Sequence, residues 1–448
     1  MKIPMPPPRL QDMMNEFAEP GRGNLTNLLV RALMERGPAD PYIPWDKLRY
    51  KTPPDGLTDK EWWLVTKVRR QNLQRELPLK DFDDKPFTYA FTDVMLRAIE
   101  DVNRHLSGHI GIAERVANAA NRDRYLINSL MEEAITSSQL EGALTTRAVA
   151  KEMIRSGRPP ANRHERMILN NYAAMRRIGE LRNEAVTPEL IKEIQRVVTE
   201  DTLDNPDAAG RFQLPGEERV GVYDNENNLL HRPPPAETIE ERVITLCAFA
   251  NGELETSSYI PPVIRAIIVH FIVGYEHPFE DGNGRTARAL FYWIMLRQDY
   301  WLTEFISISR ILRAAPVRYA HSYLHTEQDD NDLTYFILYH LEVIQRAIKD
   351  LHTYLERKIQ EAREFQRLVA STPGEFNDRQ IALLQNALRN PDTRYTVQSH
   401  GRSHGVVRQT ARQDLFDLER RDLLERYNVG RKFVWKPMPD LEAKLRSG

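Results

Sequence analysis

The fold is decided by residues 277–288, which read His277-Pro278-Phe279-Glu280-Asp281-Gly282-Asn283-Gly284-Arg285-Thr286-Ala287-Arg288. They follow one apolar segment, 262–274, and run into the start of a second, 286–297, and each segment predicts a helix. Two glycines bracket Asn283, so the backbone can turn tightly and point successive N–H groups into one concavity. Because the second helix is expected to begin directly after these glycines, its positive N-terminal dipole adds to that concavity. The stretch therefore predicts an anion-binding loop between two helices.

Charged side chains in this loop indicate its chemistry. Arg285 and Arg288 lie three residues apart on one helix face, so both guanidinium groups can reach the same polyphosphate. Asp281 offers a carboxylate of the kind that holds Mg²⁺ beside substrate phosphates, and His277 can accept a proton from an attacking hydroxyl. Taken singly, each residue has an ordinary structural interpretation: a histidine that caps a helix, an Asp-Gly turn, and solvated arginines. Together in one loop they predict transfer at a phosphorus centre.

The same residues resemble the Fic family signature, His-x-Phe-x-(Asp/Glu)-Gly-Asn-Gly-(Arg/Lys)-x-x-Arg, at every defined position. The resemblance covers about residues 120–365 and implies a mainly α-helical Fic core with a small β-hairpin flap. It implies transfer of AMP from Mg-ATP to a Ser, Thr or Tyr hydroxyl of a target protein. His277 would be the general base, Phe279 would anchor the loop and Asp281 would hold Mg²⁺. The nucleotide would be bound by Gly282, Asn283, Gly284, Arg285 and Arg288, the last of which positions the γ-phosphate.

Gly284 bears on which phosphate moves. The Doc branch of the family, which phosphorylates its target, resembles this loop with a bulkier residue at that position, so glycine favours AMP transfer. The expected function is a protein adenylyltransferase, with self-modification as a further expectation. Two alternatives stay open: removal of AMP or transfer of another nucleotide, which the same residues can support, and a DNA-binding regulator whose Fic core only senses nucleotide.

An inhibitory helix is expected upstream, at about residues 122–142. Ser137 and Glu141 lie four residues apart on one face of it, and Gly142 can end it as a C-cap. A glutamate at a helix C-terminus is unfavourable to the dipole, which predicts a partner elsewhere. The pattern resembles the Fic inhibitory motif, (Ser/Thr)-x-x-x-Glu-(Gly/Asn). There the glutamate pairs with the second motif arginine, here Arg288, and forces ATP into an unproductive pose; the alternative is an ordinary solvated glutamate.

Residues 216–232 predict a β-hairpin, because a β-branched run and a second short run flank an Asp/Asn turn. This hairpin resembles the flap with which Fic proteins hold a target segment by strand addition. The main-chain partners would be Val220, Gly221, Val222 and Tyr223. A hairpin with a purely structural role is the alternative.

The length, composition and charge of the whole chain limit the kind of protein it can be. The chain has 448 residues, 41% apolar and 28% charged residues and a formal net charge of −2, which is typical of a globular protein with two or three domains. The single cysteine, Cys247, excludes an internal disulfide framework and is expected to be buried and inert. No signal peptide or membrane span is evident, so we expect a cytoplasmic protein. Residues 1–120 are expected to form a proline-rich wrapping segment followed by helix.

The C-terminal residues 376–438 differ in charge. From Asp378 to Pro437 there are 12 Lys and Arg and 7 Asp and Glu, a difference of +5 against −2 for the whole chain. Helices at 379–388 and 406–420, a loop between them and a two-stranded wing predict a winged helix. His400 and His404 would lie in the loop, where a two-ligand metal site is a poor expectation. Winged helices bind DNA or serve as protein-docking and dimer modules, so DNA contact through Arg402, Arg408 and Arg412 and a homodimer both stay open.

Overall fold

The computed structural model describes residues 1–19, 24–34, 41–107, 119–224, 226–254, 256, 258–370, 376–429 and 432–447. The chain divides into two compact units, Met1–Leu351 and His352–Gly448, and each is described here by itself. Both are mainly helical, with three separate two-stranded antiparallel sheets among the described residues. The mainly α fold class expected from the sequence is confirmed by this arrangement and by the structural likeness reported below.

The first part of the chain is more helical than the sequence indicated. It forms α1 (Leu10–Ala18), α2 (Leu25–Met34), α3 (Trp45–Leu48) and α4 (Asp59–Gln71), which pack their apolar residues into a cluster of their own. Thr58 and Glu61 cap α4 reciprocally, so the start of this helix is fixed by a capping box. Lys67 of α4 donates to Asp329 at 2.6 Å in a buried ion pair, which fastens the helix to the rest of the first unit.

A β-hairpin that the sequence analysis did not predict follows α4. Its strands, β1 (Gln74–Lys80) and β2 (Pro86–Ala90), pair antiparallel around a turn in which Asp81 accepts two backbone N–H groups. Leu77, Leu79, Phe87 and Tyr89 alternate along the strands and are buried. This period-two pattern was present in the sequence, but it is short and interrupted by proline and charged residues.

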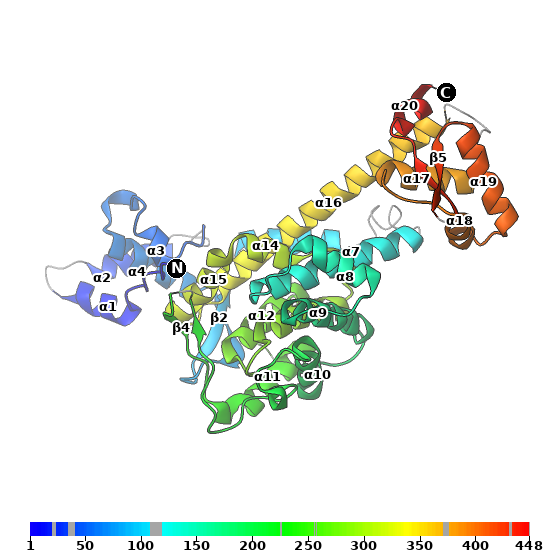
Figure 1. Ribbon diagram of the computed structural model, residues 1–448. Coiled ribbons are helices and arrows are strands. Elements are labelled where there is room, and N and C mark those ends of the chain that lie inside the picture. The colour runs from blue at the N-terminus through cyan, green and yellow to red at the C-terminus, as the bar shows by residue number, and fades with distance from the viewer. Residues whose placement is uncertain are drawn as a thin grey trace. The chain divides into compact units, whose positions relative to one another are not determined.

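The helical core of the first unit follows the hairpin (Figure 1). Nearly every side chain of its two central helices, α12 and α13, is buried, including His270, which bonds the Tyr319 hydroxyl at 2.9 Å. Cys247 of α11 is buried too, and burial raises the pKa of its thiol to about 12. The core helices are α5 (Asp93–Leu106), α7 (Ala119–Leu140), α8 (Arg147–Ser156), α9 (Arg163–Glu180), α10 (Pro188–Thr199), α11 (Ile239–Asn251), α12 (Pro262–Glu276), α13 (Asn283–Arg297), α14 (Ile308–Ala314), α15 (Pro316–Gln328) and α16 (Thr334–Ala370), whose residues after Leu351 belong to the second unit.

The hairpin expected at 216–232 is present but short. Its strands are β3 (Val222–Tyr223) and β4 (Leu229–His231), joined by a turn in which Asp224 accepts the N–H groups of Glu226 and Asn228. The sequence also predicts a helix over about 92–119; the structure describes α5 within this range, and residues 108–118 lie outside the described residues. Within the part of the chain that the structure describes, no helix combines the length and apolar character needed to cross a bilayer.

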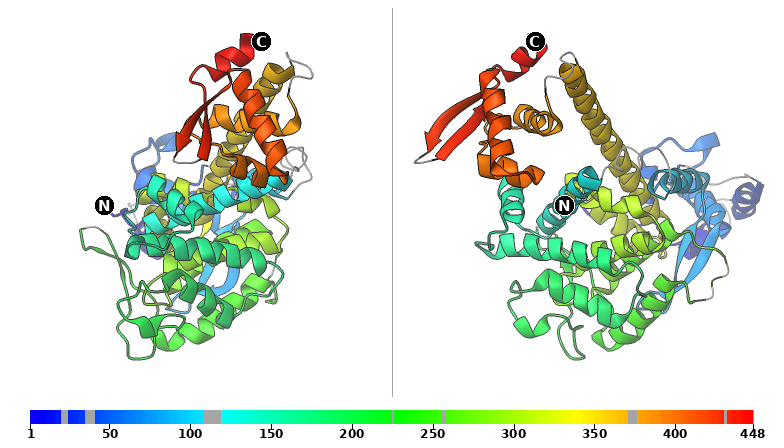
Figure 2. Two further views of the ribbon diagram at one scale, coloured as in Figure 1. Left: turned by 45° about the vertical axis from the view of Figure 1, so that its right-hand side comes forward. Right: turned by 90° about the vertical axis from the view of Figure 1, so that its right-hand side faces the viewer.

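The second unit contains α17 (Asp378–Arg389), α18 (Val397–His404), α19 (Arg408–Arg420), β5 (Leu424–Val429), β6 (Lys432–Pro437) and α20 (Leu441–Ser447). Three helices followed by a hairpin are the element order of a winged helix, and Figure 2 shows the β5–β6 hairpin beside α19. The expected loop between 389 and 406 is wrong in part, since α18 lies within it and carries His400 and His404. Thr396 caps α18 and Gly405 ends it in the left-handed region, so the helix has only eight residues. A helix this short has too few apolar residues to show a helical period in the sequence.

Candidate active site

The loop between α12 and α13 is a tight connection whose backbone requires special conformations. His277 ends α12 in the left-handed region, with φ 44°, and Gly282 precedes α13 with φ 85°. A Cβ on Gly282 would lie 2.7 Å from Cγ2 of Thr199, so only glycine fits there. The second helix begins at Asn283, three residues earlier than the sequence indicated. The first helical turn thus contains Asn283, Gly284 and Arg285, whose N–H groups have no acceptor inside the helix.

Asn283 closes the loop on itself. Its side-chain oxygen accepts the Phe279 N–H at 3.0 Å and its amide donates to the Phe279 carbonyl at 2.8 Å. Phe279 is fully buried and its ring lies 5.2 Å from that of Phe212. The Asn283 side chain is therefore occupied by the loop, and its backbone N–H is the group left to bind an anion.

Arg285 is also held by the protein. It is fully buried, donates to the Val198 carbonyl at 2.6 Å and reaches both carboxylate oxygens of Asp281 at 3.2 Å. Gln195 supports the same turn, since its amide donates to the Asp281 carbonyl at 3.0 Å and its oxygen accepts the Gly210 N–H at 2.6 Å. The two motif arginines thus have different surroundings: Arg285 braces the loop next to Asp281, and Arg288 faces α7.

Asp281 is the candidate metal ligand, and its side chain is 41% exposed. Among the described residues no group of three or more His, Cys, Asp or Glu side chains is arranged to hold a metal. A single half-exposed carboxylate beside an anion-binding turn fits an ion that completes its shell with phosphate oxygens and water, as Mg²⁺ does. The residues therefore fit Mg²⁺ that arrives with a nucleotide, and they do not form a metal site without one.

Arg288 makes the ion pair that the resemblance implied. Its Nη2 donates to Glu141 at 2.7 Å, while Nε and Nη2 donate to the hydroxyl and carbonyl of Ser137 at 2.8 and 3.1 Å. Arg288 is 2% exposed and the Glu141 side chain is 31% exposed. Burial alone would lower the pKa of Arg288, but the Glu141 carboxylate outweighs it and raises the pKa above its ordinary value. The side chain is thus charged and fully engaged with the end of α7.

The Glu141 carboxylate also occupies the space that a side chain at position 284 would fill. A Cβ on Gly284 would collide with Oε1 of Glu141 and would lie 2.9 Å from its Cδ and 3.1 Å from Nη1 of Arg288. The absence of a side chain at Gly284 therefore has two consequences. It leaves the loop open for an anion, and it lets the carboxylate of α7 sit against the first turn of α13.

A buried carboxylate that the sequence analysis missed anchors α7. Glu133 is 1% exposed and accepts from the Tyr292 hydroxyl at 2.9 Å, the Ser307 hydroxyl at 2.8 Å and the Ser309 N–H at 3.1 Å. Tyr292 belongs to α13, and the two serines lie at the start of α14. One turn before Ser137, α7 is therefore tied to the same helix that carries Arg288. No local pattern marks Glu133, because its partners lie far away in sequence.

His277 faces the loop in a form suited to accept a proton. Its Nδ1 lies 3.3 Å from the Gly274 carbonyl, and because a carbonyl can only accept, Nδ1 carries the hydrogen and Nε2 keeps its lone pair. Burial lowers the pKa of His277 to about 4, although the Gly274 carbonyl opposes the shift. The imidazole is therefore neutral at pH 7, which is the protonation state of a general base.

Arg219, a second residue that the sequence analysis missed, fixes the position of His277. It lies just before β3 and donates to the Glu276 carbonyl at 2.5 Å and the His277 carbonyl at 3.1 Å. Its Nε also donates to the Pro234 carbonyl at 2.7 Å. A guanidinium on the last carbonyls of a helix is favoured by the dipole of α12. Arg219 thus connects the segment before β3 and the segment after β4 to the backbone of His277.

The expected target-binding residues of the flap lie at and just before β3. Val220, Gly221 and Val222 are partly buried and Tyr223 is 55% exposed. Only Val222 and Tyr223 are in the strand, and they pair with β4 on one side. The structure therefore places these residues on the segment that leads directly from Arg219.

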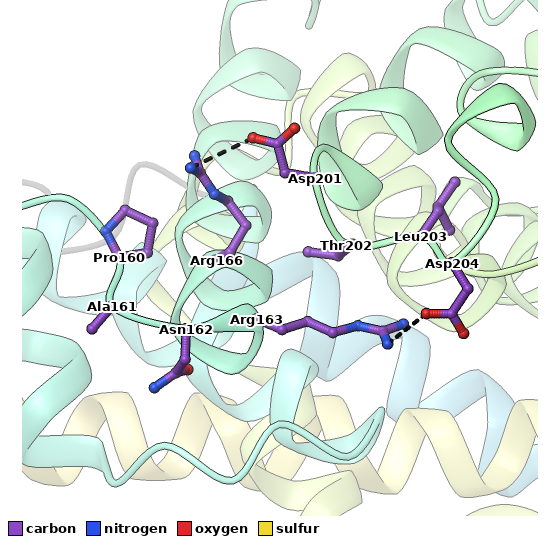
Figure 3. Close-up of a pocket in the computed structure, with 9 residues that line it drawn as sticks. All are labelled: Pro160, Ala161, Asn162, Arg163, Arg166, Asp201, Thr202, Leu203 and Asp204. Atoms are coloured by element: carbon purple, nitrogen blue, oxygen red, sulfur yellow. Dashed lines mark hydrogen bonds and ion pairs between the residues drawn. The ribbon is translucent and has the colours of Figure 1, made fainter.

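A separate pocket of about 290 Å³ lies between the N-terminus of α9 and the end of α10, as the close-up in Figure 3 shows. Arg163 pairs with Asp204 at 2.9 Å and Arg166 pairs with Asp201 at 3.5 Å. Each basic side chain of this pocket is thus matched by an acidic one. It includes none of the residues 277–288 and carries no comparable chemistry.

Comparison with known proteins agrees with this architecture. A family model described as the Fic/DOC family matches residues 185–295, which include α12, the loop and most of α13. The chain therefore carries a Fic/DOC domain. A Fic family protein from Desulfovibrio desulfuricans has a similar fold, with a TM-score of 0.52 and 17% identity, covering 78% of this chain and 98% of that one.

Two curated relatives are similar at modest identity. Protein adenylyltransferase fic-1 of Caenorhabditis elegans is 25% identical over 222 residues, which is 48% of this chain and 40% of the relative. Protein adenylyltransferase Fic of Nematostella vectensis is 28% identical over 185 residues, 40% of each protein. The chain thus spans about two fifths of the length of these relatives.

Proposed function

We propose that this chain is a protein adenylyltransferase that moves AMP from Mg-ATP onto a Ser, Thr or Tyr hydroxyl and is held in check by Glu141. The observation that carries the proposal is the neutral, positioned imidazole of His277 beside the free N–H groups of Asn283, Gly284 and Arg285. A base next to an anion cradle is the arrangement that phosphoryl-centre transfer requires. The adenylyltransferase names of the two curated relatives support the same reaction.

The reaction follows from these contacts. The target hydroxyl gives its proton to Nε2 of His277 as its oxygen forms a bond to the α-phosphorus of ATP. The bond between the α-phosphorus and the bridging oxygen of the β-phosphate breaks, and pyrophosphate leaves with that oxygen. The N–H groups of the first turn of α13 stabilise the charge on the transferring phosphate. Mg²⁺ bound at Asp281 would neutralise charge on the α- and β-phosphates.

The brake acts through Arg288. A γ-phosphate needs an arginine that can turn to it, and the Arg288 side chain is occupied by Glu141 and Ser137. The carboxylate of Glu141 also places negative charge against Gly284, where a phosphate chain would pass. Both effects disfavour the productive pose of ATP without removing any catalytic group.

The flap would hold the target. An extended target segment could pair its backbone with Val220–Tyr223 and bring its hydroxyl to His277. Because Arg219 joins this segment to the His277 carbonyl, target binding and base position would be coupled. A flexible segment of the chain itself could enter in the same way, which makes self-modification an expected side reaction.

The experiment is mass spectrometry of peptides after incubation with Mg-ATP. A Glu141→Gly variant should produce AMP-modified Ser, Thr or Tyr peptides from itself or from added cell proteins. The matched control is the double variant Glu141→Gly, His277→Ala, which should produce none. Modified peptides at equal yield in both variants would contradict the assignment of His277 as the base.

A further inference from the structure

The second unit contains a helix-turn-helix. The helices α18 and α19 are joined by Gly405, Val406 and Val407, with Gly405 in the left-handed region at φ 63° and the Val406 N–H bonded to the Gly401 carbonyl at 3.0 Å. Two helices joined by such a short glycine-containing turn are the arrangement in which the second helix enters a DNA groove. In this unit the second helix is α19.

The two faces of α19 have different chemistry. Ala411, Leu415 and Leu418 are buried at helical spacing and hold the helix against the core of the unit. The opposite side of its first half carries two arginines and two glutamines at i, i+1, i+4 and i+5, and all four are exposed: Arg408, Gln409, Arg412 and Gln413. Arginine and glutamine are the side chains that make paired hydrogen bonds to guanine and adenine edges in the major groove.

Acidic residues are absent from α18, the turn and the first half of α19. Residues 396–413 contain three arginines and two histidines and no Asp or Glu. The first carboxylate of α19, Asp414, is 4% exposed and is bonded to Arg379, Asn377 and His400. Within the described part of the chain, Arg402 and Arg408 have no carboxylate partner, while Arg412 lies over the Phe416 ring at 5.3 Å. This part of the described surface therefore carries arginines without acidic partners, while the nearby Asp414 carboxylate is already paired inside the unit. Such a surface is suited to bind a polyanion.

We propose that the second unit binds double-stranded DNA, with α19 in the major groove. Arg408, Gln409, Arg412 and Gln413 would face base edges and the adjoining phosphates. Arg402 of α18 would contact the phosphate backbone, where the first helix of such a motif crosses it. Val407 gives α19 no side-chain cap, so the first N–H groups of the helix are available to a phosphate as well. This inference does not depend on AMP transfer by the first unit.

The test is fluorescence anisotropy of the full chain with a labelled 24-base-pair duplex of random sequence, a length of about two helical turns. Binding in the range of about 10⁻⁴–10⁻⁶ M is expected, and it should weaken as salt rises. The triple variant Arg402→Ala, Arg408→Ala, Arg412→Ala should bind at least about tenfold more weakly and lose about three units of salt slope. All three residues are exposed, so its thermal unfolding should match that of the wild type.

The matched control is Arg420→Ala, which removes an exposed arginine at the far end of the same helix that already pairs with Asp417 at 2.6 Å. It should bind DNA as the wild type does. Selection from a random duplex pool should then enrich a motif with the wild type and fail to enrich it with the triple variant. No binding by the wild type, or equal loss in the triple variant and the Arg420 control, would overturn the proposal and leave the unit as a protein-docking module.

Discussion

Removal of the Glu141 carboxylate is the perturbation that tests the brake in most detail. Arg288 donates to Ser137 through two bonds and to Glu141 through one at 2.7 Å, so the Glu141→Gly variant removes the charged partner and leaves the Ser137 contacts in place. It also empties the space next to Gly284. The arginine should then be free to reach a γ-phosphate, and the rate of AMP transfer should rise.

The magnitude follows from the same contacts. Couplings between sites are about 1–3 kcal/mol, which corresponds to about 5- to 150-fold. The Glu141 side chain is 31% exposed, so solvent screens part of the interaction, and the Ser137 bonds persist. We therefore expect the middle of that range, about 1.5–2 kcal/mol, or an increase of about 10- to 30-fold in transfer rate.

The assay is the initial rate of incorporation of α-labelled AMP into protein at saturating ATP. The matched control is Glu132→Ala, because Glu132 lies on the same helix and pairs with Arg147 and Lys151 at the surface, away from Arg288. It should leave the rate unchanged. A Glu141→Gly rate within about twofold of the Glu132→Ala rate, below the smallest coupling expected, would refute the reasoning.

Three further predictions follow from the site. Because burial lowers the pKa of His277 to about 4, the imidazole is already neutral at pH 5.5, so the activity of the Glu141→Gly variant should stay level from pH 5.5 to 8 and fall only toward pH 4. A midpoint near 6.5, the ordinary pKa of histidine, would contradict a base whose pKa is lowered by burial. The Arg219→Ala variant should lose up to about 10²-fold in kcat with ATP binding retained, since a displaced base slows chemistry without touching the nucleotide, whereas a change in KM for ATP alone would contradict a positioning role. The Glu133→Ala variant leaves the Tyr292 hydroxyl and the Ser309 N–H without their buried acceptor, so denaturant unfolding should show a loss of about 2–4 kcal/mol, and a loss below 1 kcal/mol would mean that α7 is anchored elsewhere.

The chemistry proposed for the loop rests on residues that lie close together in the chain. Two glycines, a carboxylate and two arginines within twelve residues constrain each other, and the pairing of Glu141 with Arg288 was implied by resemblance. The hydrogen-bond partners of the individual side chains in the loop could not be predicted in this way. The Asn283 amide turns inward to the Phe279 carbonyl in the same loop, and Arg285 donates to the carbonyl of Val198, which lies 87 residues away in the chain.

Polar contacts between residues far apart in the chain could not be predicted from the sequence either. Arg219 lies 58 residues from His277, and Glu133 lies 159 residues from Tyr292, so neither has a local pattern that marks it. Short elements were missed for a different reason. The strands β1 and β2 and the helix α18 have too few residues for periodicity to outweigh their proline, glycine and charged residues, and tertiary packing together with caps such as Thr396 stabilises them.

The central claim is that AMP, and not the terminal phosphate, moves to protein with His277 as the base. The most direct measurement is a parallel incubation of the Glu141→Gly variant with ATP labelled at the α- or the γ-phosphate, followed by counting of protein-bound label. Label from the α position alone, abolished when His277→Ala is added, is the predicted result. Protein-bound label from the γ position would contradict the account, because it would mean that the opening beside Gly284 presents the terminal phosphate to the attacking hydroxyl.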